Sequence, residues 1–285
     1  HWAVALLAAV LGGALWGLIG LFNRRLSAGG LSAQSIVVVR NLGGLVVLTL
    51  VLALTDRKAL RIQWKHLPYF FGTGVVSVLC FTLCYFRCQQ ICSLAMAAIL
   101  LYTAPAFVVL LSALLWREKV TGRKLAALVL AFLGCVFVSG ILQGGLALSP
   151  LGLILGVASG FFYGLYSIFG RYALAHYQPL TVTYYTFLFA GLGSLPLLRL
   201  EEVGPALESL PLLGSAVGLV VVATVLPYIL YTRGLARVDS GRASILASVE
   251  PVVAALVGVA AFGEPLSWGV VLGLGCILTT VYLLR

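Results

Sequence analysis

Ten apolar runs, each about 20 residues long, follow one another along this chain with only short polar connections between them. A helix of that length crosses the roughly 30 Å of hydrocarbon in a bilayer. Only 9% of the 285 residues are charged, whereas a soluble domain carries about 25%. The sequence therefore predicts an all-α integral membrane protein with ten transmembrane helices, at 2–22, 32–54, 66–87, 93–116, 124–142, 150–172, 179–198, 211–232, 243–262 and 266–284.

The net charge of +10 follows the connections rather than one face, which argues against a nucleic-acid partner. Thirteen of the 18 Lys and Arg lie in or within two residues of the connections after the second, fourth, sixth and eighth runs, or at the C-terminus. Cytoplasmic loops are the ones enriched in Lys and Arg. We therefore expect a multi-pass protein of the inner (cytoplasmic) membrane with both termini in the cytoplasm. The lipid bilayer is its expected environment.

The second half of the chain repeats the first. An offset of 146 places Pro251 on Pro105 and Glu264 on Glu118, and an offset of 147 places Gly160 on Gly13 and Tyr163 on Trp16. Because five helices is an odd number, the second copy must enter the membrane upside down, as in many transporters. The expected halves are residues 1–145 and 146–285, each with five helices.

Glu250 and Pro251 stand in the middle of the ninth apolar run. A charge at that depth costs roughly 2.5 to 3.5 kcal/mol on insertion scales, so a carboxylate there is a functional candidate. Proline lacks an amide donor, so it leaves a carbonyl near Ala247 free to face a ligand, a water or a neighbouring helix. Pro105 occupies the equivalent place in the fourth run, and both prolines are expected to break their helices.

Arg40 is the other charge well inside a run. Its side chain could extend towards the membrane interface. Alternatively it could face the interior, as a gate or counter-charge for Glu250 or for an anionic group of a substrate.

Aromatic residues near the middle of the runs suggest a binding pocket around Glu250. Aromatic faces attract organic cations, and a carboxylate neutralises them. Stacking on an aromatic substrate is the other use of such a pocket. The candidate substrate-binding residues are Trp16, Tyr85, Tyr102, Tyr163, Tyr166, Tyr228 and Glu250.

Residue patterns for catalysis or for a cofactor are missing from the sequence. The chain has three histidines, and it lacks a phosphate-binding glycine loop. Cys80, Cys84, Cys88 and Cys92 are spaced by four residues, so they drift around their helix and cannot converge on one metal ion. We expect neither an enzyme nor a bound cofactor. Glu118 and Glu264, which close two runs, are expected to accept backbone N–H groups of the next helix.

Several segments resemble the EamA-type family of the drug/metabolite transporter superfamily. They are A-L-W-G in the first run, V-V-V-R-N in the second, P-A-F-V-V-L-L-S-A-L-L-W-R-E ending at Glu118, and S-V-E-P-V-V-A-A-L around Pro251. The resemblance covers both halves. It implies ten helices in two inverted halves around a central cavity, alternating access, and a small metabolite as cargo.

The expected function is a secondary active transporter for an amino acid or amine, aromatic or cationic, coupled to a proton or Na⁺ if to any ion. Uptake of a quaternary, choline-like amine is a close alternative. A protein of another class, which handles lipids or acts as a membrane scaffold, is the rival interpretation. A monomer and a homodimer are both compatible with the sequence.

Overall fold

The computed structural model describes residues 2–92, 94–143 and 149–284. Throughout this part of the chain every regular element is a helix, so the predicted all-α class is confirmed. The expected boundary between residues 145 and 146 lies outside the described residues.

Eight helical segments in the described part are long and apolar enough to cross a membrane. They are Trp2–Ala28, Ala33–Thr55, Trp64–Gln89, Met96–Trp116, Pro150–Leu174, Pro179–Leu197, Leu210–Leu235 and Ser240–Phe262. Two further helices, α8 (Gly122–Val138) and α16 (Trp268–Leu284), have 17 residues each and pack against one another. They occupy the places of the fifth and tenth expected helices.

Several segments are interrupted helices. The helices before residue 144 are α1 (Trp2–Trp16), α2 (Ile19–Ala28), α3 (Ala33–Thr55), α4 (Leu67–Phe71), π-helical η3 (Gly72–Leu79), α5 (Cys80–Ile91), α6 (Leu94–Leu101), α7 (Ala104–Trp116) and α8. Those after residue 148 are α9 (Pro150–Leu174), α10 (Pro179–Ser194), α11 (Leu200–Glu208), α12 (Leu210–Val220), π-helical η6 (Val221–Val225), α13 (Leu226–Leu235), α14 (Ser240–Ala247), α15 (Glu250–Phe262) and α16. Short 3₁₀ turns lie at Arg57–Leu60, Trp64–His66, Ile141–Gln143 and Leu195–Leu197.

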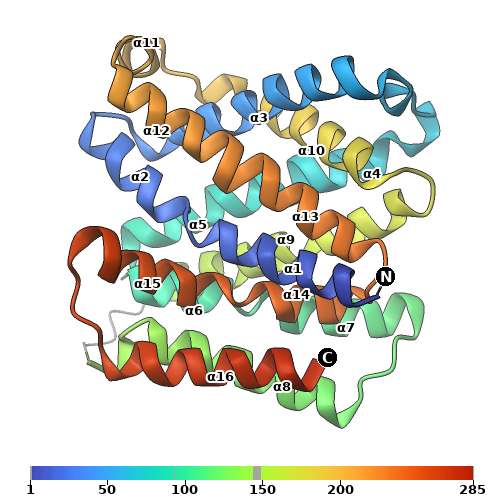
Figure 1. Cartoon of the computed structure of the whole chain (residues 1–285), viewed down its shortest axis with the longest axis vertical. Coiled ribbons are helices and arrows are strands. Elements are labelled where there is room, and N and C mark those ends of the chain that lie inside the picture. The colour runs from blue at the N-terminus through green and yellow to red at the C-terminus, as the bar shows by residue number, and fades with distance from the viewer. Residues whose placement is uncertain (1, 93, 144–148, 285) are drawn as a thin grey trace.

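The interruption between α6 and α7 recurs 146 residues later, between α14 and α15. The bounds of α6 and α7 coincide with those of α14 and α15 when 146 is added to each. Pro105 and Pro251 are the second residues of α7 and α15, where the missing amide donor leaves no helical bond unmade. In Figure 1, α6 and α7 run from left to right, whereas α14 and α15 run from right to left. The two interrupted pairs are therefore antiparallel.

Glycines let the helices cross closely at these interruptions. A Cβ on Gly13 would lie 2.6 Å from the Ala247 carbonyl oxygen, and one on Gly160 would lie 2.8 Å from the Leu100 carbonyl oxygen. Small residues allow such an approach between membrane helices. The Ala247 carbonyl thus faces a neighbouring helix, and α1 and α9 each pack on the interrupted pair of the other sequence copy.

Candidate functional site

A cavity of about 480 Å³ lies among the helices and collects most of the chemically interesting residues. Its walls come from α1, α2, α3, α5, α6, α8, α9, α13 and α15. Its polar and aromatic lining consists of Trp16, Asn23, Arg24, Arg40, Phe81, Thr82, Tyr85, Phe86, Gln89, Tyr102, Ser139, Tyr163, Tyr228, Glu250 and Glu264.

The cavity brings together eight of the sequence-derived candidates. These are Trp16, Arg40, Tyr85, Tyr102, Tyr163, Tyr228, Glu250 and Pro251. Tyr166 lies deeper, in a separate small pocket, where its hydroxyl is 2.6 Å from Thr232 Oγ1. Pro105 is buried in α7 and does not line the cavity. Tyr166 and Pro105 therefore lie outside the cavity.

Glu250 reaches the cavity because it is the first residue of α15. Tyr163 donates a hydrogen bond from its hydroxyl to Glu250 Oε2 across 3.4 Å, and Tyr102 lies beside the same carboxylate. The amino end of a helix carries a partial positive charge, which favours a carboxylate there. Because the chain breaks at Ser248 and Val249, the Glu250 carboxylate lies at a helix amino end and beside two tyrosines, and both reduce the cost of burying its charge.

Arg40 approaches the cavity from the middle of α3. Its Nε donates to Thr224 Oγ1 at 3.1 Å, and its guanidinium carbon lies 5.8 Å from the centre of the Tyr228 ring. Tyr228 in turn packs edge-on against Trp16, with ring centres 5.0 Å apart. Arg40 therefore faces the interior, where its remaining donors can meet a ligand.

Arg40 and Glu250 supply opposite charges to one chamber. Among the ion pairs of the described residues, none joins the two side chains. An arginine binds a carboxylate through paired hydrogen bonds, and a carboxylate beside aromatic rings suits an ammonium group. The arrangement can hold a small molecule that carries both charges.

Several polar lining residues escaped the sequence analysis. Asn23 Oδ1 is a buried atom without a hydrogen-bond partner in the described protein, as is Nε1 of the predicted Trp16. Thr82, Gln89 and Ser139 also line the cavity. Asn23 stands beside two arginines at the end of an apolar run, where a polar residue is ordinary, so no local pattern marked it.

Comparison with known proteins identifies a transporter family. The EamA-like transporter family matches residues 3–140 and again residues 150–285. An Archaeoglobus fulgidus protein named only as an uncharacterized transporter is 31% identical over 225 residues, which is 78% of this chain and 79% of that protein. YicL of Salmonella typhimurium, named as an uncharacterized inner membrane transporter, is 26% identical over 98% of this chain and 94% of its own length.

Two further matches concern cargo and fold. The threonine/homoserine exporter RhtA of Escherichia coli is 30% identical over 66% of this chain and 61% of its own length. A solved crystal structure superposes with a TM-score of 0.81 at 18% identity, covering 99% of this chain and 96% of that one. At that identity the match shows a shared fold.

Proposed function

The chain belongs to the EamA-like transporter family, and we propose that it is a secondary active transporter that moves a small amino acid or amine through the central cavity by alternating access. It is a multi-pass membrane protein. The observation that carries the proposal is the placement of Arg40 and Glu250 in one aromatic chamber.

The proposed membrane topology has ten helices in two inverted halves of five. The antiparallel course of the two interrupted pairs supports an inverted relationship (Figure 1). At 1.5 Å per residue, the 17 residues of α8 and of α16 span about 25 Å, close to the hydrocarbon thickness. The distribution of Lys and Arg supports cytoplasmic termini.

An α-amino acid is the proposed cargo because it presents a carboxylate to Arg40 and an ammonium group to Glu250. Threonine and homoserine, for which the exporter RhtA is named, are both amino acids. The rings of Trp16, Tyr102 and Tyr163 line the same chamber and favour an apolar or aromatic side chain. Export is the proposed direction, driven by the substrate's own gradient or by a coupled proton or Na⁺.

A choline-like cation is the second candidate. The carboxylate of Glu250 and the ring of Tyr228 support it, since both attract a quaternary ammonium group. Arg40 opposes it, because a cation without a carboxylate leaves the guanidinium facing a like charge. The two candidates therefore differ in what Arg40 contributes.

A lipid-handling role receives less support. A groove of about 470 Å³ on the protein is lined by Phe107, Leu153, Ile154, Val157, Ala158, Phe161 and Phe162, which are all apolar. A lipid carrier needs polar partners for a headgroup as well as a path for the chains. Among the described residues, the apolar groove lacks such polar partners. The polar side chains line the central cavity instead, and the size of that cavity suits a small metabolite.

A melting-shift panel on the purified protein tests the proposal. Ligands bound to the folded state raise its melting temperature. Aromatic and small amino acids, their decarboxylated amines, choline and short-chain phospholipids form the panel. Stabilisation by amino acids above amines supports the proposal, stabilisation by choline alone supports the second candidate, and stabilisation by phospholipids alone rejects both.

A further inference from the structure

Two arginine–glutamate ion pairs occupy equivalent places in the two sequence copies. Arg171 pairs with Glu118, and Arg24 pairs with Glu264. The glutamates are related by the offset of 146 and the arginines by the offset of 147, the same two offsets that relate the rest of the repeat.

An aromatic ring completes each pair. The guanidinium carbon of Arg171 lies 4.5 Å from the centre of the Trp116 ring, and that of Arg24 lies 4.5 Å from the centre of the Phe262 ring. Trp116 and Phe262 are again 146 residues apart. We name the first set the Glu118 latch (Trp116, Glu118, Arg171) and the second the Glu264 latch (Arg24, Phe262, Glu264).

The backbone presents both glutamates in the same way. The residue before each one is left-handed, with φ of 53° at Arg117 and 66° at Gly263. The amide of Glu118 then bonds the Ser112 carbonyl, and that of Glu264 bonds the Gly258 carbonyl. This helix ending satisfies orphaned carbonyls and turns the chain sharply. The two latches are thus built by one local design used twice.

The latches lie at opposite ends of the bundle. The Glu118 latch follows α7, which ends on the right in Figure 1, and the Glu264 latch follows α15, which ends on the left. Each latch joins a residue before position 144 to one after position 148. Each therefore ties the two sequence copies together at one end.

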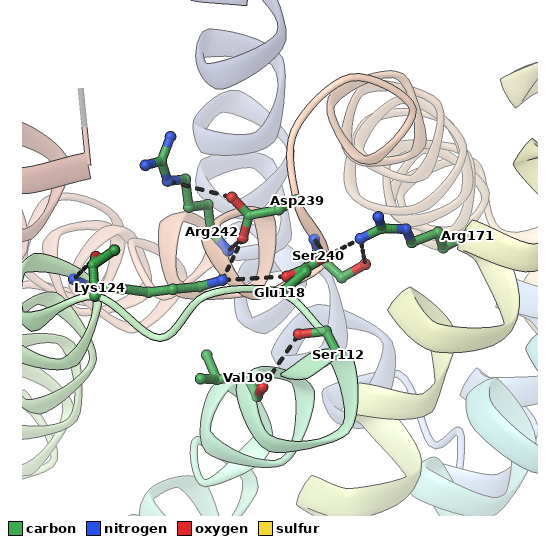
Figure 2. Close-up of polar contacts among 9 residues, drawn as sticks. Val109, Ser112, Glu118, Lys124, Arg171, Asp239, Ser240 and Arg242 are labelled. Carbon is green, nitrogen blue, oxygen red and sulfur yellow. Dashed lines mark hydrogen bonds and ion pairs between the residues drawn. The ribbon is translucent and has the colours of Figure 1, made fainter. Parts of the chain in front are cut away.

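Glu118 is the buried part of its latch, whereas Arg171 is 33% exposed, and Glu118 also contacts a second layer of charges formed by Lys124 and Asp239 (Figure 2). The side chains of Glu118 and Lys124 are only 9% and 5% exposed, and Lys124 Nζ lies 3.2 Å from Glu118 Oε2 and 2.6 Å from Asp239 Oδ1. The backbone N–H of Ser240 also donates to Glu118. Glu118 therefore accepts a backbone N–H from the start of α14 and contacts α8 through the Lys124 side chain, whereas the sequence analysis expected backbone N–H groups of the next helix, α8.

The Glu264 latch is open to its surroundings. Its Arg24 and Glu264 side chains are 55% and 42% exposed, and both line the cavity. Exposed ion pairs contribute little to stability, whereas removing one partner of a buried pair is strongly unfavourable. The position equivalent to Lys124 is Val270, so the sequence does not repeat the second charge layer.

We propose that the two latches are counterpart gates of one pathway: the Glu264 latch forms the mouth through which substrate reaches the cavity, and the Glu118 latch holds the opposite end shut. This gating assignment rests on the proposed transport function. Net transport then requires the Glu118 latch to break, and the second charge layer biases the resting protein towards the conformation described.

Hydrogen exchange measured by mass spectrometry, on protein in lipid nanodiscs without substrate, tests this proposal. Glu118→Gln should raise amide exchange in residues 239–247 by about tenfold, a typical size for a coupling between two states. It should also lower exchange in residues 263–268, because opening one end closes the other. Glu264→Gln should leave residues 239–247 unchanged, as should the control Glu208→Gln on the exposed end of α11.

Opposite changes in exchange at the two ends distinguish gating from a local loss of stability around Glu118. Faster exchange at residues 239–247 without protection at residues 263–268 would make the Glu118 latch a local brace and overturn the proposal, as would unchanged exchange at both ends. Arg171→Gln, which breaks the same latch but leaves Glu118 paired with Lys124, should shift both segments in the same directions as Glu118→Gln. Reciprocal exchange in a protein that moves no metabolite would reject the transport proposal alone, and active transport without reciprocity would reject the latches alone.

Discussion

The Tyr163 hydroxyl donates to the Glu250 carboxylate across 3.4 Å, which joins the middle of α9 to the start of α15. Both residues sit at positions where the sequence copies differ, since Trp16 and Ala104 occupy the equivalent places. The acidic side of the cavity is therefore supplied by the second copy alone. The proposed amino acid is therefore expected to bind this chamber asymmetrically, with its ammonium group towards α15.

Replacing Glu250 by Gln removes the charge and keeps the shape. A hydrogen bond to a charged group contributes about 1.5–3 kcal/mol, so affinity for an amino acid or amine should fall by roughly 10- to 100-fold. Isothermal titration with the best ligand of the melting panel measures the change. Glu208→Gln serves as the matched control, and equal affinities for the two variants would remove Glu250 from the site.

Arg40 should discriminate between amino acids and amines. Arg40→Gln loses the partner of the substrate carboxylate, so amino acid affinity should fall by about tenfold or more, while affinity for the decarboxylated amine should hold or rise. Lysine keeps the charge but not the paired geometry, so Arg40→Lys should recover only part of the loss. Parallel losses for both ligand classes would show that Arg40 supports the fold rather than the carboxylate.

Tyr163 and Tyr166 should separate binding from stability. Tyr163→Phe removes a long hydrogen bond at the cavity wall, so substrate affinity should drop by less than about tenfold with little change in melting temperature. Tyr166→Phe breaks the buried contact with Thr232, which should cost about 1 kcal/mol of stability and leave affinity unchanged. Titration and thermal unfolding of both variants check the pair, and the reverse assignment of effects would contradict the geometry.

The contact between Glu202 of α11 and the start of α3 should be lost in acid. The hydroxyls of Ser32 and Ser35 and the amide of Ser32 donate to its carboxylate, which lowers the pKa of Glu202 to about 2. Because the folded pKa lies below the ordinary value of 4.5, the contact is fully present above pH 4.5 and is lost as pH falls towards 2. Limited proteolysis of α11 should therefore accelerate only in that acid range, and Glu202→Gln should show the faster cleavage already at neutral pH. Identical cleavage of the two proteins at pH 7 would count against it.

The sequence predicted the helical class and the approximate spans because hydropathy and length decide what can cross a bilayer. It also identified Glu250 and Arg40 as unusual, since a charge inside an apolar run is costly. Eight candidates then proved to line one cavity. Tyr102 and Glu250 reach that cavity from the two helix interruptions that share the offset of 146.

The remaining features depend on how each helix is rotated about its axis and on which helices pack together. The residue pattern of an apolar helix does not reveal either. A membrane helix has no polar face to mark its interior side, so Tyr163 and Tyr166 looked equivalent although only Tyr163 lines the cavity. The break at Gly17 and Leu18 and the π-helical segment η3 contain neither a proline nor a charge, so the sequence did not mark them, whereas η6 ends two residues before Pro227. The latches did leave a signal, because Arg24 and Arg171 obey the offset of 147.

Counterflow in proteoliposomes tests the central claim most directly. Vesicles loaded with an unlabelled amino acid and diluted into a trace of the labelled one should accumulate label transiently in wild-type protein, and Glu250→Gln should abolish most of that overshoot. Accumulation no greater than in protein-free vesicles, for every amino acid and amine that stabilises the protein, would contradict transport through this cavity.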